Sequence, residues 1–179
     1  MNITLKVAAI GMLLSSSITA YFVSQAEQNT IHNNVGHTVL MEATQFNGHY
    51  YRVYDYGMTW NDARDFCQKM GGHLVTITSK SENELVKQLI SNEHSKETYW
   101  IGGYKDENSN WSWVTDENFS YSKWATGEPN NINYRENNIE MYNSRNSKDE
   151  PLGSWNDVTE NVLMPNRGFI CEWEHDDSD

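Results

Sequence analysis

Two stretches, residues 59–72 and 79–91, have apolar side chains at the spacing of amphipathic helices. In TWNDARDFCQKMGG, residues 59–72, the apolar positions at helical spacing are Ala63, Phe66, Cys67 and Met70. Thr59, with Asp62 three positions later, predicts the start of this helix, because a threonine hydroxyl accepts a hydrogen bond from a first-turn amide. Gly71 predicts its end, since glycine readily adopts the left-handed conformation that closes many helices.

A second helix is predicted over SKSENELVKQLIS, residues 79–91. Ser79 and Glu82 have the spacing of a capping box, in which each side chain accepts from the other's backbone amide. The apolar positions of this helix form one stripe: Leu85, Val86, Leu89 and Ile90.

Short β-prone runs surround these helices. GHYYRVYDYG precedes the first helix, HLVTIT lies between the two, YWIGGY follows the second, and SWNDV and GFICEWE close the chain. Between Lys105 and Ser154 the chain is mostly polar, broken by WSWV and IEMY. A structureless stretch this long in a compact domain is normally functional or disordered. We expect four tryptophans to pack in the core: Trp100, Trp113, Trp124 and Trp155.

Length and charge restrict the function classes. A chain of 179 residues predicts one domain. It carries 25 acidic and 13 basic residues, for a net charge of -12, which argues against binding a nucleic-acid backbone. The balance suits an exported protein or one that binds cations.

The N-terminus has the features of a signal peptide over residues 1–26. Lys6 precedes an apolar run and then small residues, with Ser24 and Ala26 before the expected cleavage site. The alternative is a membrane anchor from Val7 to Val23, but that stretch is short and contains several hydroxyl residues. We expect a secreted or extracellular protein, periplasmic if bacterial, with no membrane insertion after cleavage. Residues 27–45 are expected to be a linker, 46–174 the domain and 175–179 an acidic tail.

The chain has two cysteines, Cys67 and Cys171. In an exported protein an even number of cysteines indicates a disulfide. This disulfide would link positions 104 apart. The alternative is two separate buried thiols.

Residues 46–173 together resemble the C-type lectin-like family. TWNDARDFCQKMGGHLVTITSKSENELV resembles its first helix, cysteine and second helix, and YWIGG its core strand. WSWVTDENFSYSKWATGEPN resembles the run into the sugar-binding loop, while WND and FIC resemble the closing strands. The resemblance implies an α+β fold, with two helices, small antiparallel sheets and a long calcium- and sugar-binding loop.

The loop GEPNNINYRENNIE, with WND further on, supplies the expected ligands of a calcium ion. These are the oxygen-bearing side chains of Glu128, Asn130, Glu136, Asn156 and Asp157. Calcium takes six to eight oxygen ligands, and three carboxylates with one divalent ion leave such a site with a net charge of about −1. Singly, each residue also suits a solvated polar loop. The resemblance implies a cis peptide bond at Pro129.

By the same resemblance, vicinal hydroxyls of a sugar complete the calcium shell. The expected sugar-binding residues are Glu128, Asn130, Glu136 and Asn156. The EPN order implies equatorial 3- and 4-hydroxyls, as in mannose, glucose, N-acetylglucosamine and fucose-like sugars, whereas QPD would favour galactose. Carboxylates accept from the hydroxyls and amide NH₂ groups donate to them.

The chain departs from the family pattern in three places. The inner disulfide near the loop is missing, with Asn138 at its first position and the second near Glu160. The segment from Asn143 to Gly153 looks inserted. Asn131 and Asn137 stand where the auxiliary calcium site uses acids, which disfavours a second calcium ion; Asp106 and Glu107 are the other residues that could contribute to one, and the sequence leaves this open.

Enzymatic functions are disfavoured. A glycosidase would need an acid and a base carboxylate, but the acids here are grouped with amides, and no nucleophile arrangement is present. The six histidines have no zinc-ligand spacing, so surface or structural roles are expected: His32, His37, His49, His73, His94 and His175. No coiled-coil heptads indicate an oligomer. The sequence therefore predicts a non-catalytic, calcium-dependent lectin for mannose-type glycans. The alternative is a protein-binding adhesion module on the same fold, with calcium ordering the loop.

Overall fold

The computed structural model describes residues 42–92, 94–143, 151–160 and 166–174. The expected signal peptide, most of the linker and the acidic tail lie outside these ranges, as do residues 144–150 of the segment that looks inserted. Within them, neither helix combines the length and apolarity needed to cross a membrane.

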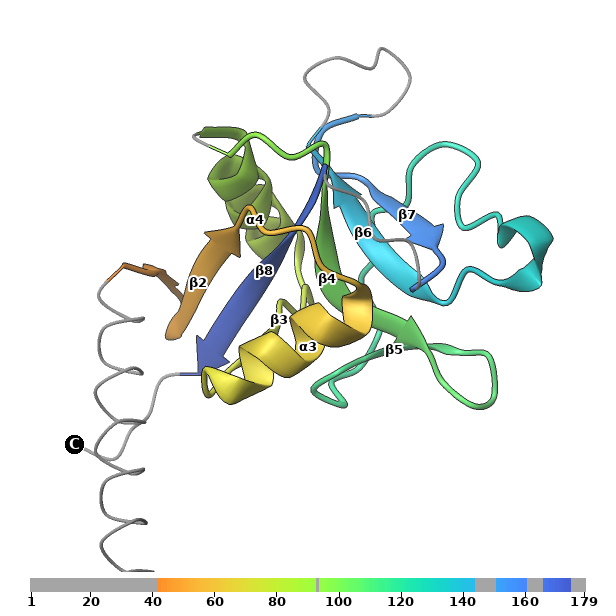
Figure 1. Cartoon of the computed structure of the whole chain (residues 1–179), viewed down its shortest axis with the longest axis horizontal. Helices are drawn as coiled ribbons and strands as arrows, with labels where there is room; N and C mark the ends of the chain where they lie inside the picture. Colours follow the sequence, from red (N-terminus) through yellow and green to blue (C-terminus); the bar gives the residue numbers. More distant parts are fainter. Residues whose placement is uncertain (1–41, 93, 144–150, 161–165, 175–179) are drawn as a thin grey trace, which may run out of the picture. The chain divides into compact units, whose positions relative to one another are not determined.

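Both predicted helices are present (Figure 1). Helix α3 spans Trp60–Lys69. The Thr59 side chain caps it by accepting a hydrogen bond from the Asp62 amide at 3.2 Å. Gly71 follows with a φ of +79°, and its amide and that of Gly72 donate to Gln68 and Cys67 carbonyls, both at 3.0 Å. Start and end of this helix are therefore confirmed.

Helix α4 spans Lys80–Asn92, and its cap differs from the prediction in one bond. The Glu82 amide donates to the Ser79 hydroxyl at 3.2 Å, as a capping box requires. The Glu82 carboxylate, however, accepts from the Thr78 amide at 2.8 Å and from the Tyr51 hydroxyl at 2.8 Å. Tyr51 lies on strand β2 (His49–Tyr54), so the carboxylate that was expected only to cap the helix also forms a tertiary hydrogen bond.

The strands form one connected sheet, in the order β1-β2-β8-β4-β6-β7, with β3 on β8 and β5 on β4. Their bounds are β1 Thr44–Phe46, β2 His49–Tyr54, β3 His73–Leu74, β4 Thr98–Lys105, β5 Trp111–Trp113, β6 Asn138–Tyr142, β7 Trp155–Val158 and β8 Arg167–Glu174. Of the pairings between these strands, that of β4 with β8 is parallel and the others are antiparallel. Strand β1 pairs with β2, so the sheet includes Thr44 and Gln45 from the expected linker.

Strand β8 lies at the centre of the sheet and is buried on both faces. Every residue from Arg167 to Trp173 is buried, and β8 pairs with β2, β3 and β4. Helix α3 packs against β3, β4 and β8, and α4 against β2. Two helices with a mainly antiparallel sheet confirm the α+β class.

The core contains the tryptophans predicted for it. Trp100, Trp113 and Trp155 are fully buried, and Trp124 is partly buried against the same cluster. The Trp155 indole nitrogen donates to the Asn83 side-chain oxygen at 2.9 Å, which ties β7 to helix α4.

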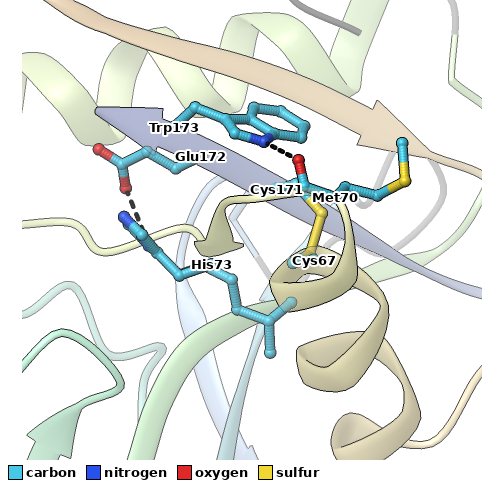
Figure 2. Close-up of a disulfide and its surroundings, with 7 residues drawn as sticks. Cys67, Met70, His73, Cys171, Glu172 and Trp173 are labelled. Carbon is cyan, nitrogen blue, oxygen red and sulfur yellow. Dashed lines mark hydrogen bonds and ion pairs between the residues drawn. A yellow bond between two sulfur atoms is a disulfide. The ribbon is translucent and has the colours of Figure 1, made fainter. Parts of the chain in front are cut away.

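Cys67 and Cys171 form the predicted disulfide, with 5.6 Å between their Cα atoms. It joins helix α3 to strand β8 (Figure 2). Beside it, the Trp173 indole nitrogen donates to the Met70 carbonyl at 2.9 Å. The first helix and the last strand are thus held together by a covalent bond and a hydrogen bond.

Candidate functional site

A backbone bridge joins the polar loop to strand β7. Trp124 and Trp155 form an isolated parallel bridge. The Ala125 amide donates to the Trp155 carbonyl, and the Trp155 amide donates to the Lys123 carbonyl, both at 2.8 Å. Trp155 immediately precedes Asn156 and Asp157 on β7. The bridge therefore brings these two candidate ligands close to the start of the loop that carries Glu128.

Asp157 lies at the centre of the candidate site. Its side chain is fully buried. Its carboxylate accepts from the backbone amides of Asn130 at 2.9 Å and Asn131 at 3.0 Å. The Lys105 ammonium lies 3.7 Å from it. Asp157 therefore holds the loop against β7.

Glu128 and Asn130 are bonded to each other beside Asp157. The peptide bond between Glu128 and Pro129 is cis, the form that the family resemblance implies. The Asn130 side-chain amide donates to Glu128 Oε1 at 2.9 Å, and its backbone amide lies 3.1 Å from Oε2. Burial raises the pKa of Glu128, and its hydrogen bond with Asp157 and the charge of Asp157 raise it further.

Glu136 closes the loop from its other end. Its carboxylate accepts from the Ile132 amide at 2.6 Å, and the residue is buried. Burial raises its pKa; the Ile132 bond opposes this, while repulsion from Asp157 adds to it. Between Glu128 and Glu136 the backbone is left-handed at Asn131, Asn133 and Tyr134. Asparagine tolerates this conformation, but a tyrosine rarely adopts it.

Asn156 is positioned by a buried ion pair. Its side-chain nitrogen donates to Glu140 Oε1 at 3.0 Å. The other oxygen of Glu140 accepts from Arg167 Nε at 2.7 Å, and the Arg167 guanidinium lies 4.2 Å from the centre of the Trp100 ring. Glu140 engages one N–H of the amide, so the Asn156 oxygen is left to bind a cation and the second N–H to donate to another acceptor.

The donor set fits calcium. Three carboxylates and two amides supply oxygen only, as a hard cation prefers. The raised pKa values of Glu128 and Glu136 have a shared cause in the charge of Asp157, so a divalent cation there would relieve a repulsion already present. Loop amides now donate to Glu128, Glu136 and Asp157, but a carboxylate oxygen has a second lone pair for a metal.

Four side chains of this region were not identified from the sequence. Lys105 donates to the Glu136 carbonyl at 2.7 Å, and Glu140 orients Asn156. Ile132 and Tyr134 are large apolar residues on the loop, 57% and 91% exposed. Lys105 and Glu140 act through pairing across strands, which no local motif records. The two exposed apolar residues could have been noticed, since they interrupt a polar loop.

The positions of the missing inner disulfide line a hollow of about 600 Å³ beside the loop. Asn138 is buried there, and its side-chain oxygen has no hydrogen-bond partner among the described residues. Glu160 instead accepts from the Asn61 side chain at 2.7 Å. A polar contact to helix α3 thus stands near the place where the family has a covalent bond.

Comparison with known sequences agrees with this architecture. The family model "Lectin C-type domain" matches residues 56–173. A perlucin-like protein of Mytilus galloprovincialis is 37% identical over 118 residues, which cover 64% of this chain and 70% of that protein.

Solved structures share the fold. The cow CD23 carbohydrate-recognition domain, crystallised in the presence of a GlcNAc2Man3 oligosaccharide, aligns with a TM-score of 0.62 and 25% identity, over 74% of this chain and 92% of that one. A calcium-independent type II antifreeze protein aligns with a TM-score of 0.60 and 23% identity, over 74% and 91%. At that identity the second similarity concerns the fold alone.

Proposed function

Because the chain belongs to the C-type lectin domain family, we propose that it binds mannose-type glycans through a calcium ion held by the Glu128–Asp157 region. The family is one of non-enzymatic lectins, and it typically binds calcium, although some members do not. The single observation that carries the calcium proposal is the convergence on buried Asp157: Glu128, Glu136 and the Asn130 amide all interact with it.

In this proposal the five oxygen-bearing side chains share two tasks. Glu128, Glu136 and Asp157 supply negative charge, and Asn130 and Asn156 supply neutral amide oxygens, to a calcium ion. The same residues except Asp157 then bind the sugar hydroxyls. Glu128 and Glu136 accept hydrogen bonds from them, while the amides donate. Bound calcium would act as a Lewis acid and bind the vicinal hydroxyl oxygens directly.

Asp157 has a separate role in the proposal, because its oxygens already bond two loop amides. It would set the position of the loop relative to the ion, while Lys105, 3.7 Å away, partly balances the charge. The acid–amide order at Glu128 and Asn130 sets the pattern of acceptor and donor, which supports equatorial 3- and 4-hydroxyls as the ligand.

One shallow monosaccharide site typically gives millimolar affinity, about −4 kcal/mol. Useful retention therefore depends on several copies or on a multivalent glycan. We further propose that the protein acts outside the cell, where calcium is abundant and where the disulfide is stable.

The proposal is tested by retention of the purified protein on immobilised mannose with calcium, followed by elution with EDTA. We expect retention that EDTA abolishes and that Glu128→Gln prevents. Glu84→Gln, which removes a surface carboxylate paired with Lys87 at 2.6 Å, is the matched control and should be retained. If calorimetry detects calcium binding but neither mannose nor other sugars retain the protein, the sugar proposal is wrong, and the loop is a calcium-ordered surface for a protein ligand.

A further inference from the structure

Strand register brings two histidines and two glutamates to one face of the sheet. Glu172 and Glu174 are two positions apart on β8, so their side chains project to the same side. His49 on β2 is the register partner of Glu174, and His73 on β3 is the register partner of Glu172. The four side chains thus come from three strands: β8 itself, and β2 and β3, which pair with its two edges.

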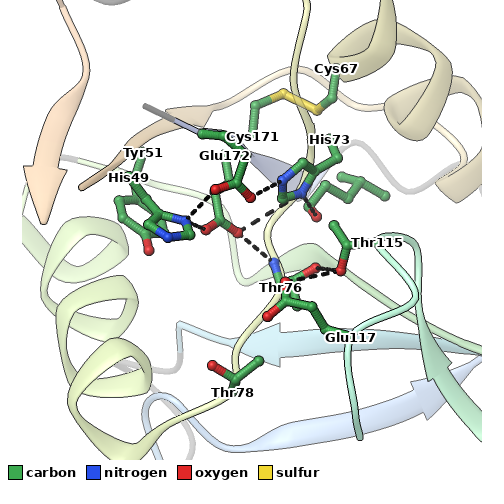
Figure 3. A network of polar contacts seen from close by, with 12 residues as sticks. His49, Tyr51, Cys67, His73, Thr76, Thr78, Thr115, Glu117, Cys171 and Glu172 are labelled. Atoms are coloured by element: carbon green, nitrogen blue, oxygen red, sulfur yellow. Dashed lines mark hydrogen bonds and ion pairs between the residues drawn. A yellow bond between two sulfur atoms is a disulfide. The ribbon is translucent and has the colours of Figure 1, made fainter. Parts of the chain in front are cut away.

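The ligand atoms of His49, Glu172 and Glu174 are close together, and His73 lies beside Glu174. His49 Nδ1 lies 2.7 Å from Glu172 Oε1 and 3.4 Å from Glu174 Oε2. His73 Nε2 lies 3.4 Å from Glu174 Oε1. Figure 3 shows His49 and His73 on either side of the Glu172 carboxylate. Among the described residues, His49, Glu172 and Glu174 are the one group of His, Cys, Asp or Glu with at least three such atoms within 4.8 Å of one another.

Further hydrogen bonds fix the orientation of His73 and Glu172. His73 Nδ1 lies 3.0 Å from the Leu74 carbonyl, which can only accept, so Nδ1 carries the proton. In the neutral ring, Nε2, which faces Glu174, then holds the lone pair that a metal would bind. The Thr76 amide donates to Glu172 Oε2 at 2.8 Å, fixing that carboxylate. Such outer bonds set the tautomer and ring orientation of metal-binding histidines.

Glu172 is the buried carboxylate of this cluster, while His49 and Glu174 are partly exposed to solvent. The Glu172 side chain is 2% exposed, whereas those of His49 and Glu174 are 33% and 59% exposed. A buried carboxylate is costly to ionise without compensation, and burial raises the pKa of Glu172 to about 7. The exposed side gives a metal ion a path to it.

We propose that His49, His73, Glu172 and Glu174 form a binding site for a divalent transition metal of the zinc(II) class. Two imidazole nitrogens and two carboxylate oxygens match the ligands and the coordination number that zinc prefers. Calcium and magnesium instead select all-oxygen sites. The site shares no residue with the candidate calcium loop, so it is independent of the proposed sugar binding.

A metal here would connect β2, β3 and β8 next to the disulfide at Cys171. Since the ligands come from distant parts of the chain, the ion would bind the folded protein much more tightly than the unfolded one. Binding of that kind raises the free energy of unfolding.

The test is titration of the EDTA-treated, dialysed purified protein with zinc(II) by calorimetry and with cobalt(II) by visible absorption, both in excess calcium. We expect one high-affinity equivalent and the intense visible bands of four-coordinate cobalt. His49→Gln and His73→Gln should each weaken zinc binding by at least about tenfold. Glu174→Gln, at an exposed position, should do the same. Thermal unfolding checks that each variant is native.

Two controls keep the result specific. His94→Gln alters another histidine beside a carboxylate, Asp55 at 3.4 Å, and should bind zinc like the unchanged protein. Glu128→Gln, in the loop, should also leave zinc binding unchanged. Zinc binding that none of the three site variants weakens, or that His94→Gln weakens equally, would overturn the proposal, as would no binding at micromolar zinc.

Discussion

The backbone amide of Asn130 donates a 2.9 Å hydrogen bond to the buried carboxylate of Asp157, 27 positions further along the chain. This bond places the EPN segment against strand β7, so that the acids of the loop and those of the strand share one environment. Burial raises the pKa values of Glu128 and Glu136, and repulsion from the charge of Asp157 adds to both shifts. That repulsion makes the region sensitive to changes of single charges.

Removing one of these charges should have opposite effects with and without calcium. Glu128→Gln relieves repulsion with Asp157, so in EDTA we expect unfolding free energy to rise by about 0.5–1 kcal/mol. In calcium the variant should lose the metal-dependent stabilisation. Urea unfolding with calcium and with EDTA measures both. A variant less stable than the unchanged protein in EDTA would show that the two carboxylates do not repel.

Asp157→Asn should instead destabilise the protein in both conditions. The buried carboxylate accepts from two loop amides and faces Lys105, and an amide would replace one acceptor oxygen by a donor. We expect a loss of about 1–3 kcal/mol and no calcium binding. The same unfolding series checks this, and unchanged stability in EDTA would contradict the central position of Asp157.

Exchange of the acid and amide should change the sugar preference. In Glu128→Gln with Asn130→Asp, the acceptor and donor positions are swapped while the number of carboxylates is kept. We expect retention to move from mannose to galactose with calcium binding preserved. Columns of the two sugars, with calcium titrated by calorimetry, distinguish a change of specificity from a loss of the metal.

The exposed Tyr134 should contribute to ligand contact but not to metal binding. It is 91% exposed with a left-handed backbone, which Asn adopts more easily. Tyr134→Asn therefore keeps the loop conformation and deletes the ring. We expect glycan affinity to fall about two- to tenfold, as for loss of one aromatic contact, with calcium affinity unchanged. Equal losses of both would indicate that the ring only orders the loop.

The buried Glu172 predicts that the metal-free protein loses stability as pH rises. Burial raises its pKa from 4.5 to about 7. Its neighbour His49 also has a raised pKa: burial lowers it, but the hydrogen bond and charge of Glu172 outweigh this. The folded protein thus holds these protons more tightly than the unfolded chain, so their contribution is complete below pH 4.5 and is lost as pH rises through about 7.

Since one pKa unit corresponds to about 1.4 kcal/mol, we expect the loss to be on the order of 3 kcal/mol. Urea unfolding in EDTA over this pH range measures it. Glu172→Gln, which keeps the shape of the side chain but does not titrate, should flatten the dependence. A slope of the same size in that variant would assign the effect to other groups.

Much of the chain's local structure followed from sequence alone. The helix start at Thr59 and its end at Gly71 were predicted correctly, because capping depends on residues within one or two turns. The disulfide and the α+β class were predicted as well. The candidate ligands Glu128, Asn130, Glu136, Asn156 and Asp157 could be named from their oxygen atoms and their order.

Tertiary structure decided which of these groups meet and which other groups support them. The bridge between Trp124 and Trp155, the support of Asn156 by Glu140, and the meeting of His49 and His73 around Glu172 all depend on strand pairing. The histidines have no ligand spacing in the sequence, since His49 and Glu172 are 123 positions apart. Such pairing is set by the packing of the whole sheet, so no short stretch of sequence encodes it, whereas helix caps and ligand chemistry are properties of neighbouring residues.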